Sequence, residues 1–444
     1  MPTVTSASHC HPSGGMLNEA VTWRTYVRFM LTTSCLPGRS SGRRPATFAG
    51  GKPEQMTMFQ TPPAVDSYGS EVAGATEEHE TITTVDLFAG AGGLSLGFHL
   101  AALGYLPIFA VEHDHAAAST FKQNFGCDVF DGDIESGPIY PQADVIVGGP
   151  PCQGFSPLGR DRDDASRTRM NALWEHYLDA VRLVQPRAFV IENVPEFQRS
   201  AQFAELLRVM RTDPRLREYG VGYGTLNAAD YGVPQSRRRG IFVAVRGVGA
   251  PTPDGMRLPW PPPPTHGTGL REPHRTVRDA IGDLPLLTSG TEPYVDADGS
   301  QHLHFGRTPS PKSLERYRAI PPGGNRFDLM RNRPDITPAC WANKPTGTTD
   351  VMGRLWWDRP SATIRTEFFK PEKGRYLHPV ADRVISHREA ARIQTFPDWY
   401  VFEGTKVEIA RQIGNAVPPV LGAAIARYVF RHAFEADGSG EEAV

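Results

Sequence analysis

Short β-branched runs alternate with longer segments of helical period between residues 81 and 246. Runs bounded by glycine, proline or polar turns predict strands, and segments with apolar residues on one helical face predict helices. The predicted strands are 82–87, 107–111, 144–147, 188–191 and 240–245, and the predicted helices are 94–103, 116–124 and 172–184. Strands separated by helix-length segments favour a parallel, doubly wound sheet, so we assign the chain to the α/β class.

The alternation ends after Arg246. A proline-rich stretch over 259–264 predicts a stiff connector, because proline restricts the backbone. The segment 263–404 that follows is rich in Pro, Gly, Arg and Trp and has no clear period. We interpret it as a second, smaller and irregular domain or a long insertion.

Helical character returns from about residue 406. A helix is predicted over 420–430, directly after a turn at 414–419. We therefore predict that residues 405–434 rejoin residues 81–262 in one α/β domain.

Residues 1–80 differ from the rest, because they are rich in Ser, Thr, Gly and Pro without sustained periodicity. Six basic residues and no acidic one fall between positions 24 and 52. A targeting peptide has such a composition, and a start codon assigned too far upstream would also explain it, with the first residue near Met56. We interpret the segment as a disordered extension and residues 435–444 as a disordered tail.

The composition of the 444 residues is that of a soluble globular protein, with 39% hydrophobic and 22% charged residues and a net charge of −2. No apolar run reaches the roughly 18 residues that a membrane span needs, which predicts no contact with a membrane. None of the five cysteines forms a CxxC pair, so we expect neither a disulfide framework nor a metal site.

The charge is unevenly distributed along the chain. Seven basic residues stand against two acidic ones between Arg307 and Arg333. A solvated basic face would have this composition, and so would a surface that binds a polyphosphate.

Glycines follow the first predicted strand, in the segment Asp86–Gly97, and let the backbone approach a ligand closely. Glu112 ends the second strand, at the usual place of an acid that accepts hydrogen bonds from ribose hydroxyls. Asp133 follows a further, short strand expected between 107–111 and 144–147, where it could bind the amino group of adenine. Together these acids favour an adenosine-bearing cofactor, and both NAD and S-adenosylmethionine remain open at this point.

Cys152 lies in the segment Gly148–Ser156, whose prolines and glycines exclude a helix or a central strand. A loop cysteine at the carboxyl edge of a sheet is a candidate nucleophile, and cationic neighbours would raise its thiolate fraction. Glu192 follows the predicted strand 188–191 at the same edge of the sheet. Arg237, Arg238 and Arg239 precede another strand, where they would stabilise an anion or bind a phosphate.

Five ordered motifs resemble the DNA (cytosine-5)-methyltransferase family, and the resemblance covers residues 81 to about 434. These motifs are DLFAGAGGLSLGF, GGPPCQGFS, ENV, QSRRR and QIGNAVPP. The stretches 359–365 and 388–397 also match. The resemblance implies a Rossmann-like sheet that binds S-adenosylmethionine, with residues 263–404 as a target-recognition domain.

The resemblance assigns roles to individual residues. Cys152 is implied to add to C6 of the target cytosine, Glu192 to contact N3 and the exocyclic amine, and Arg239, with Arg237 nearby, to orient the base. The cofactor-binding residues that it implies are Phe88, Ala89, Gly90, Gly92, Gly93, Leu94, Glu112, Asp133, Ile134, Pro150, Asn415 and Val417.

The implied activity is methyl transfer from S-adenosylmethionine to C5 of a cytosine flipped out of a specific double-stranded DNA sequence. A compact chain of this kind suggests a bacterial, cytoplasmic monomer in a restriction-modification system, paired with a cognate restriction endonuclease. Three other readings stay open: the same chemistry on tRNA, a catalytically silent DNA-binding module, and an NAD-dependent enzyme on the same sheet. A methylation assay with duplex DNA and tRNA side by side tests the first, covalent trapping on 5-fluorocytosine DNA the second, and a measurement of NAD binding the third.

Overall fold

The computed structural model describes residues 80–151, 164–248, 258–297, 300–343 and 348–435. The predicted disordered extension, apart from Glu80, lies outside the described residues. So do Cys152 and all of the predicted C-terminal tail except Glu435.

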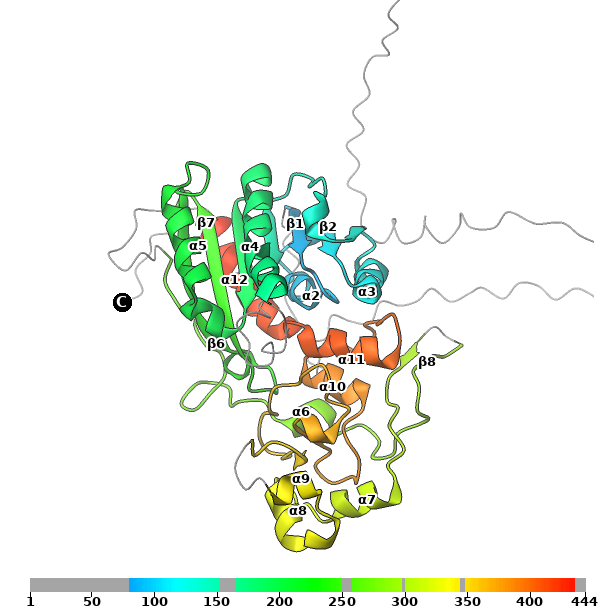
Figure 1. Ribbon diagram of the computed structural model, residues 1–444. Helices are drawn as coiled ribbons and strands as arrows, with labels where there is room; N and C mark the ends of the chain where they lie inside the picture. The colour runs from blue at the N-terminus through cyan, green and yellow to red at the C-terminus, as the bar shows by residue number, and fades with distance from the viewer. Residues whose placement is uncertain (1–79, 152–163, 249–257, 298–299, 344–347, 436–444) are drawn as a thin grey trace, which may run out of the picture. The chain divides into compact units, whose positions relative to one another are not determined.

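A seven-stranded sheet in the order β3-β2-β1-β4-β5-β7-β6 forms the centre of the described chain (Figure 1). Its strands are β1 (Ile82–Leu87), β2 (Tyr105–Glu112), β3 (Asp128–Asp131), β4 (Val145–Gly148), β5 (Ala188–Asn193), β6 (Tyr219–Asn227) and β7 (Arg238–Arg246). The first five are parallel, as predicted. The expectation of a fully parallel sheet is wrong, because β7 runs antiparallel to both β5 and β6.

Alternate residues of the strands supply the two apolar faces that the helices cover, as a period of two requires. Val145 and Val147 share one core with α2 and α12, whereas Ile146 shares the other with α4 and α5 (Figure 1). The helices around the sheet are α2 (Gly93–Leu100), α3 (His115–Phe125), α4 (Asp164–Val184), α5 (Ala201–Thr212), α11 (Lys406–Asn415) and α12 (Pro419–Ala433). Single-turn 3-10 segments span Ile134–Ser136, Pro195–Arg199 and Ala228–Tyr231.

Helices α2 and α12 approach each other closely. A Cβ added to Gly97 would lie 2.4 Å from the carbonyl oxygen of Pro419 and 2.6 Å from Cα of Gly422. Only glycine fits at that contact. The C-terminal helix is thereby placed directly behind the first helix, although more than 300 residues separate them in the chain.

The stretch Lys406–Ala433 is long and apolar enough to cross a membrane by length and composition alone. It comprises α11 and α12, and 72% of its most apolar part is buried inside the protein. No such stretch was predicted from the sequence, because only uninterrupted apolar runs were considered there. Core packing accounts for its apolar side chains.

The segment 263–404 contains short elements. They are α6 (Val277–Ile281), β8 (Tyr294–Val295), β9 (Gln301–His302), α7 (Pro311–Arg318), α8 (Arg326–Asn332), α9 (Ala339–Ala342), β10 (Gly353–Arg354), β11 (Arg375–Leu377) and α10 (His387–Ile393), with 3-10 turns at Pro334–Ile336 and Pro371–Lys373. A small core around Tyr317, Leu329 and Met352 belongs to this segment alone. Other residues of the segment, such as Val277 and Phe368, share a core with α3 and α11.

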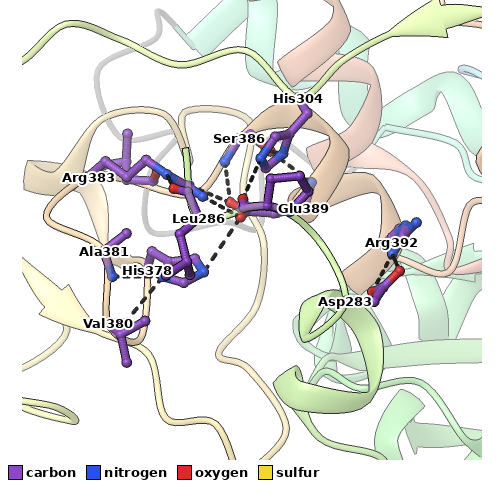
Figure 2. A network of polar contacts seen from close by, with 12 residues as sticks. Asp283, Leu286, His304, His378, Val380, Ala381, Arg383, Ser386, Glu389 and Arg392 are labelled. Atoms are coloured by element: carbon purple, nitrogen blue, oxygen red, sulfur yellow. Dashed lines mark hydrogen bonds and ion pairs between the residues drawn. The ribbon is translucent and has the colours of Figure 1, made fainter. Parts of the chain in front are cut away.

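Helix α10 is anchored by a buried carboxylate (Figure 2). Glu389 is 0% exposed, and its two oxygens accept hydrogen bonds from the guanidinium of Arg383 and from the backbone N–H of Ser386. Ser386 caps the helix and contacts the ring of His304 at 3.0 Å. The helix therefore begins in a fully paired polar cluster, which makes its position definite.

Candidate active site

The carboxyl ends of the parallel strands and the start of β7 meet at one edge of the sheet. Antiparallel pairing places Asn193, the last residue of β5, opposite Gly240 near the start of β7. The direction of β7 is therefore what brings the arginine motif to the edge where the predicted nucleophile loop begins. A parallel β7 would have placed that motif at the opposite edge.

Glu192 and Arg239 form an ion pair at this edge, with 2.7 Å between the arginine Nε and a carboxylate oxygen. Their side chains are only 12% and 16% exposed, so the pair is largely shielded from water. A Cβ added to Gly149 would lie 2.9 Å from the other carboxylate oxygen. The backbone that leads to Cys152 thus passes directly beside Glu192, and a larger residue at position 149 would have to displace that carboxylate.

Asn193 holds the start of the nucleophile loop, a role that the sequence reasoning missed although it noted the ENV motif. Its side-chain amide donates a hydrogen bond to the carbonyl oxygen of Pro150 at 3.0 Å, and its side-chain oxygen accepts one from the N–H of Val194 at 2.8 Å. The side chain is 4% exposed. A buried amide at a strand end was the signal that could have found it.

Arg237 does not lie where it could contact the base, contrary to what the resemblance implied. Its guanidinium is 1% exposed and donates to the backbone carbonyls of Ile364 at 3.0 Å, Gly414 at 3.0 Å and Asn415 at 3.3 Å. Burial, with the nearby charge of Arg239 as a smaller cause, lowers the pKa of Arg237 well below its usual value. This arginine holds the protein together behind the site and does not face it.

The basic stretch from Arg307 to Arg333 is also less available than its composition predicts. Arg326 is buried, and Arg333 contacts the carboxylates of Asp335 at 2.7 Å and Glu315 at 3.3 Å. Three further arginines bind acceptors within the protein: Arg316, Arg318 and Arg331. Part of the local positive charge is therefore paired inside this region, although the side chains of Arg318 and Arg331 are still 63% and 73% exposed.

Glu112, predicted from the sequence to contact a ribose, forms an acidic corner at this edge of the sheet. It is the last residue of β2 and is 6% exposed. Its carboxylate accepts hydrogen bonds from the N–H groups of Gly90 and Asp114, both at 2.7 Å. Nδ1 of His113 lies 3.2 Å from the same carboxylate, which leaves about one of its roughly four acceptor positions for a further donor. Gly90 has a left-handed φ of +54°, and a Cβ added to it would meet open space, as a ligand cradle requires.

The glycine-rich turn lies against the C-terminal motif. A Cβ added to Gly93 would lie 2.4 Å from the carbonyl oxygen of Val417, so the two segments are in contact. Asn415 is exposed beside it. Phe88, like Gly90, has a positive φ, of 58°. The residues predicted for one pocket, Phe88 to Gly93 and Asn415 to Val417, are thus brought together by the fold.

The remaining residues predicted to bind the cofactor differ in which of their atoms are accessible to a ligand. Leu94 and Ile134 are buried in the two cores, so only their backbone could contact a ligand. Asp133 is exposed and accepts a hydrogen bond from the N–H of Glu135 at 3.1 Å. Pro150 is buried, and Ala89 donates its N–H to the carbonyl of Val111.

Asp86 lies under the same turn, and the sequence reasoning gave it no role of its own. It is 1% exposed and accepts a hydrogen bond from the hydroxyl of Ser95 at 2.6 Å. Burial raises the pKa of Asp86 to about 7 against the lowering effect of that hydrogen bond. The contact joins the end of β1 to α2 and thereby sets the shape of the glycine-rich turn between them.

The sheet order, with the glycine-rich turn at the carboxyl edge of its parallel strands, defines a Rossmann-like α/β fold. The model of the C-5 cytosine-specific DNA methylase family matches residues 82–431, and the chain belongs to this family. It is an S-adenosylmethionine-dependent DNA (cytosine-5)-methyltransferase.

Two relatives cover most of the sequence. Type II methyltransferase M.AgeI of Thalassovita gelatinovora is 33% identical over 78% of this chain and 98% of its own length. Type II methyltransferase M.XorII of Xanthomonas oryzae is 34% identical over 78% and 84%. A crystal structure described as a prophage-encoded DNA modification methyltransferase of E. coli superposes with a TM-score of 0.59 at 25% identity, over 79% of this chain and 99% of the other.

Proposed function

We propose that the enzyme methylates a cytosine swung out of duplex DNA, through a transient bond between Sγ of Cys152 and C6 of the base. Addition at C6 makes C5 electron-rich enough to attack a methyl group, which C5 of free cytosine does poorly. Bound S-adenosylmethionine supplies that methyl group as an electrophile. Removal of the C5 proton and expulsion of the thiolate then release the product and regenerate Cys152.

The observation that carries this proposal is the shielded pair of Glu192 and Arg239 beside Gly149. Glu192 is placed to bind N3 and the exocyclic amine of the base and to support protonation at N3. General-acid assistance of this kind contributes about 10²- to 10⁴-fold in rate. Arg239 holds one oxygen of that carboxylate at 2.7 Å and keeps it oriented towards the loop.

The Glu112 corner fits the adenosine half of the cofactor. We propose that Glu112 binds the ribose hydroxyls, Asp133 the adenine amino group, and the backbone of Phe88–Gly93 the methionine half, with Pro150, Asn415 and Val417 along the wall. The support is the set of oriented acceptors and open glycine positions at one edge of the sheet.

We further propose that residues 81–262 with 405–434 form the catalytic part and that 263–404 recognise the DNA sequence. Type II methyltransferases among the bacterial relatives support a restriction-modification setting, a cytoplasmic site of action and a cognate restriction endonuclease as functional partner. We expect a monomer that acts on double-stranded DNA. Bisulfite sequencing of DNA from cells that express the protein would report the methylated site.

Substitution of Cys152 tests the nucleophile. Cys152→Ala should lower methyl transfer by at least about 10⁴-fold, since covalent catalysis is lost, and should leave DNA binding nearly unchanged. Trapping on 5-fluorocytosine DNA, which blocks the final elimination, should give a covalent adduct with the wild type and none with the variant. An adduct with the variant would contradict the assignment.

Cys127→Ala is the matched control. The side chain of Cys127 is half-buried, and burial is the main cause that raises the pKa of its thiol to about 12. It is therefore protonated at neutral pH and a poor nucleophile. We expect the control to form the adduct at the wild-type rate.

A further inference from the structure

A buried chain of amide contacts connects the base side of the site with the cofactor side. Gln235 and Gln394 are both 0% exposed, and the side-chain N–H of Gln235 donates to the side-chain oxygen of Gln394 at 2.7 Å. The side-chain N–H of Gln394 donates in turn to the carbonyl of Ile413. We call this chain of hydrogen bonds the relay. It ends at Ile413 in the last turn of α11, directly before the turn in which the carbonyl of Val417 lies against Gly93.

The other end of the relay reaches the entry of β7. The side-chain oxygen of Gln235 accepts the backbone N–H of Ile364 at 2.9 Å. The backbone around Gln235 pairs with Ser361, through bonds of 2.8 Å from Ser236 and 2.9 Å to Pro234. These contacts fix the chain three to five residues before Arg239.

Arg237 forms a second connection between the same two regions. Its guanidinium donates to Ile364 on one side and to Gly414 and Asn415 on the other. Arg237 lies directly before β7 and two residues from Arg239. The arginine that pairs with Glu192 is thus held by a neighbour that is itself bonded to the cofactor turn.

Helix α10 supplies the fixed point for the relay. Gln394 caps its C-terminus, and the Glu389 cluster holds its N-terminus (Figure 2). Buried polar groups that are fully paired define one geometry, since any shift leaves a donor or acceptor without a partner. An apolar contact at Gln394 would permit sliding and would give no such constraint.

We propose that Gln235 and Gln394, with Arg237, are positioning residues that set the Glu192–Arg239 pair and the 413–417 turn in register with each other. The inference rests on the proposed function, because it assigns the base to the first site and the cofactor to the second. None of the three contacts the reacting atoms. They act by holding the two binding walls of one reaction at a definite separation.

Two substitutions cut the relay at different links. Gln394→Glu keeps the acceptor for Gln235 but turns an oxygen towards the Ile413 carbonyl, which releases the cofactor turn. Gln235→Glu keeps the acceptor for Ile364 but turns an oxygen towards Gln394, which releases the entry of β7. We expect KM for S-adenosylmethionine to rise about tenfold in the first, and kcat to fall about tenfold in the second.

Rates are to be expressed per competent site, counted by adduct formation on 5-fluorocytosine DNA. The double variant should be less impaired than the product of the two single effects, because both cut one connection. If the Glu variants do not fold, Gln394→Asn and Gln235→Asn replace them. They shorten the side chains, which weakens the same hydrogen bonds without adding charge, so KM and kcat should change in the same directions by smaller factors.

Gln412→Glu is the control. Gln412 is 3% exposed on α11, next to Ile413, and its side chain donates to the carbonyl of Glu403 at 2.8 Å and accepts from the hydroxyl of Thr120 at 2.7 Å, neither of which belongs to the relay. It should lower the unfolding midpoint as the relay variants do, with wild-type KM and kcat per site. Relay variants that match this control would overturn the positioning role. A wild-type enzyme that forms no adduct and transfers no methyl group would instead overturn the proposed function.

Discussion

The seven-stranded sheet and the segment 263–404 hold their backbones together by different means. In the sheet, strand pairing satisfies the backbone groups, and apolar side chains fill both faces. In the segment, arginine side chains take over part of that task. Arg354 alone donates to the carbonyls of Tyr317, Ile320, His378 and Ala381 and to the carboxylate of Asp382.

Arg375 repeats the pattern, with bonds to the carbonyls of Gly323, Gly324 and Arg354 and its guanidinium 4.0 Å from the ring centre of Trp356. A guanidinium has five N–H donors in a fixed plane, so one side chain can collect loops that form no ladder. The comparison shows that the arginine content of a loop-rich domain measures its internal scaffold as well as its surface for phosphates.

The largest expected effect comes from removing such a scaffold arginine. Arg354→Met should lower the free energy of unfolding by about 3–5 kcal/mol, because several buried acceptors lose their donor at once. Chemical denaturation would measure it. Arg354→Lys should recover little, since an ammonium group cannot reach the same carbonyls. Arg318→Met, at a residue with a side chain 63% exposed, is the control and should cost less than about 1 kcal/mol.

A loss of stability of intermediate size is expected at β6, the glycine-rich strand at one edge of the sheet. A Cβ added to Gly224 in β6 would lie 2.3 Å from Nε1 of Trp260. Gly224→Ala should therefore displace the indole and lower the free energy of unfolding by about 1–3 kcal/mol. A shift in tryptophan emission would accompany the loss. Thr225→Ala, at an exposed position of the same strand, should leave both nearly unchanged.

The smallest effect is the part of the pH dependence of stability that arises from buried histidines of the segment 263–404, whereas Asp86 of the sheet, with its raised pKa, contributes with the opposite sign. Nδ1 of His378 accepts the N–H groups of Val380 and Ala381, and its Nε2 faces Glu389 at 3.6 Å (Figure 2). Burial is the main cause that lowers the pKa of His378 to about 4. The folded state thus binds fewer protons than the unfolded state between about pH 6.5 and pH 4, so stability falls as pH falls through that window.

His378→Gln should flatten this slope by about 1–2 kcal/mol between pH 7 and pH 4.5, since its amide oxygen can accept the same N–H groups without titrating. The measurement is the denaturant midpoint at several pH values. Burial also lowers the pKa of His387 to about 4, so part of the slope should survive the substitution. An unchanged slope would show that His378 does not titrate in this window.

Strand β6 shows why part of the fold escaped prediction from the sequence. It carries Gly220, Gly222 and Gly224 between Tyr219, Val221 and Tyr223, and because glycine is depleted in strands the segment was not predicted to be one. Gly222 and Gly224 are explained by a distant residue, because Trp260 packs over them and leaves little room for side chains. By contrast, β1 forms over residues 82–87 as predicted, since a buried β-branched run is a local signal.

The sequence by itself determined the class of the fold, the family and the order of the motifs, because these depend on local periodicity and on glycine, proline and cysteine spacing. The tertiary structure decided which of the three consecutive arginines faces the site. β7 turned out to be antiparallel, which placed Arg239 beside Glu192, and the turn after α11 enclosed Arg237. Strand direction and burial arise from packing between segments far apart in the chain, and no local pattern specifies them.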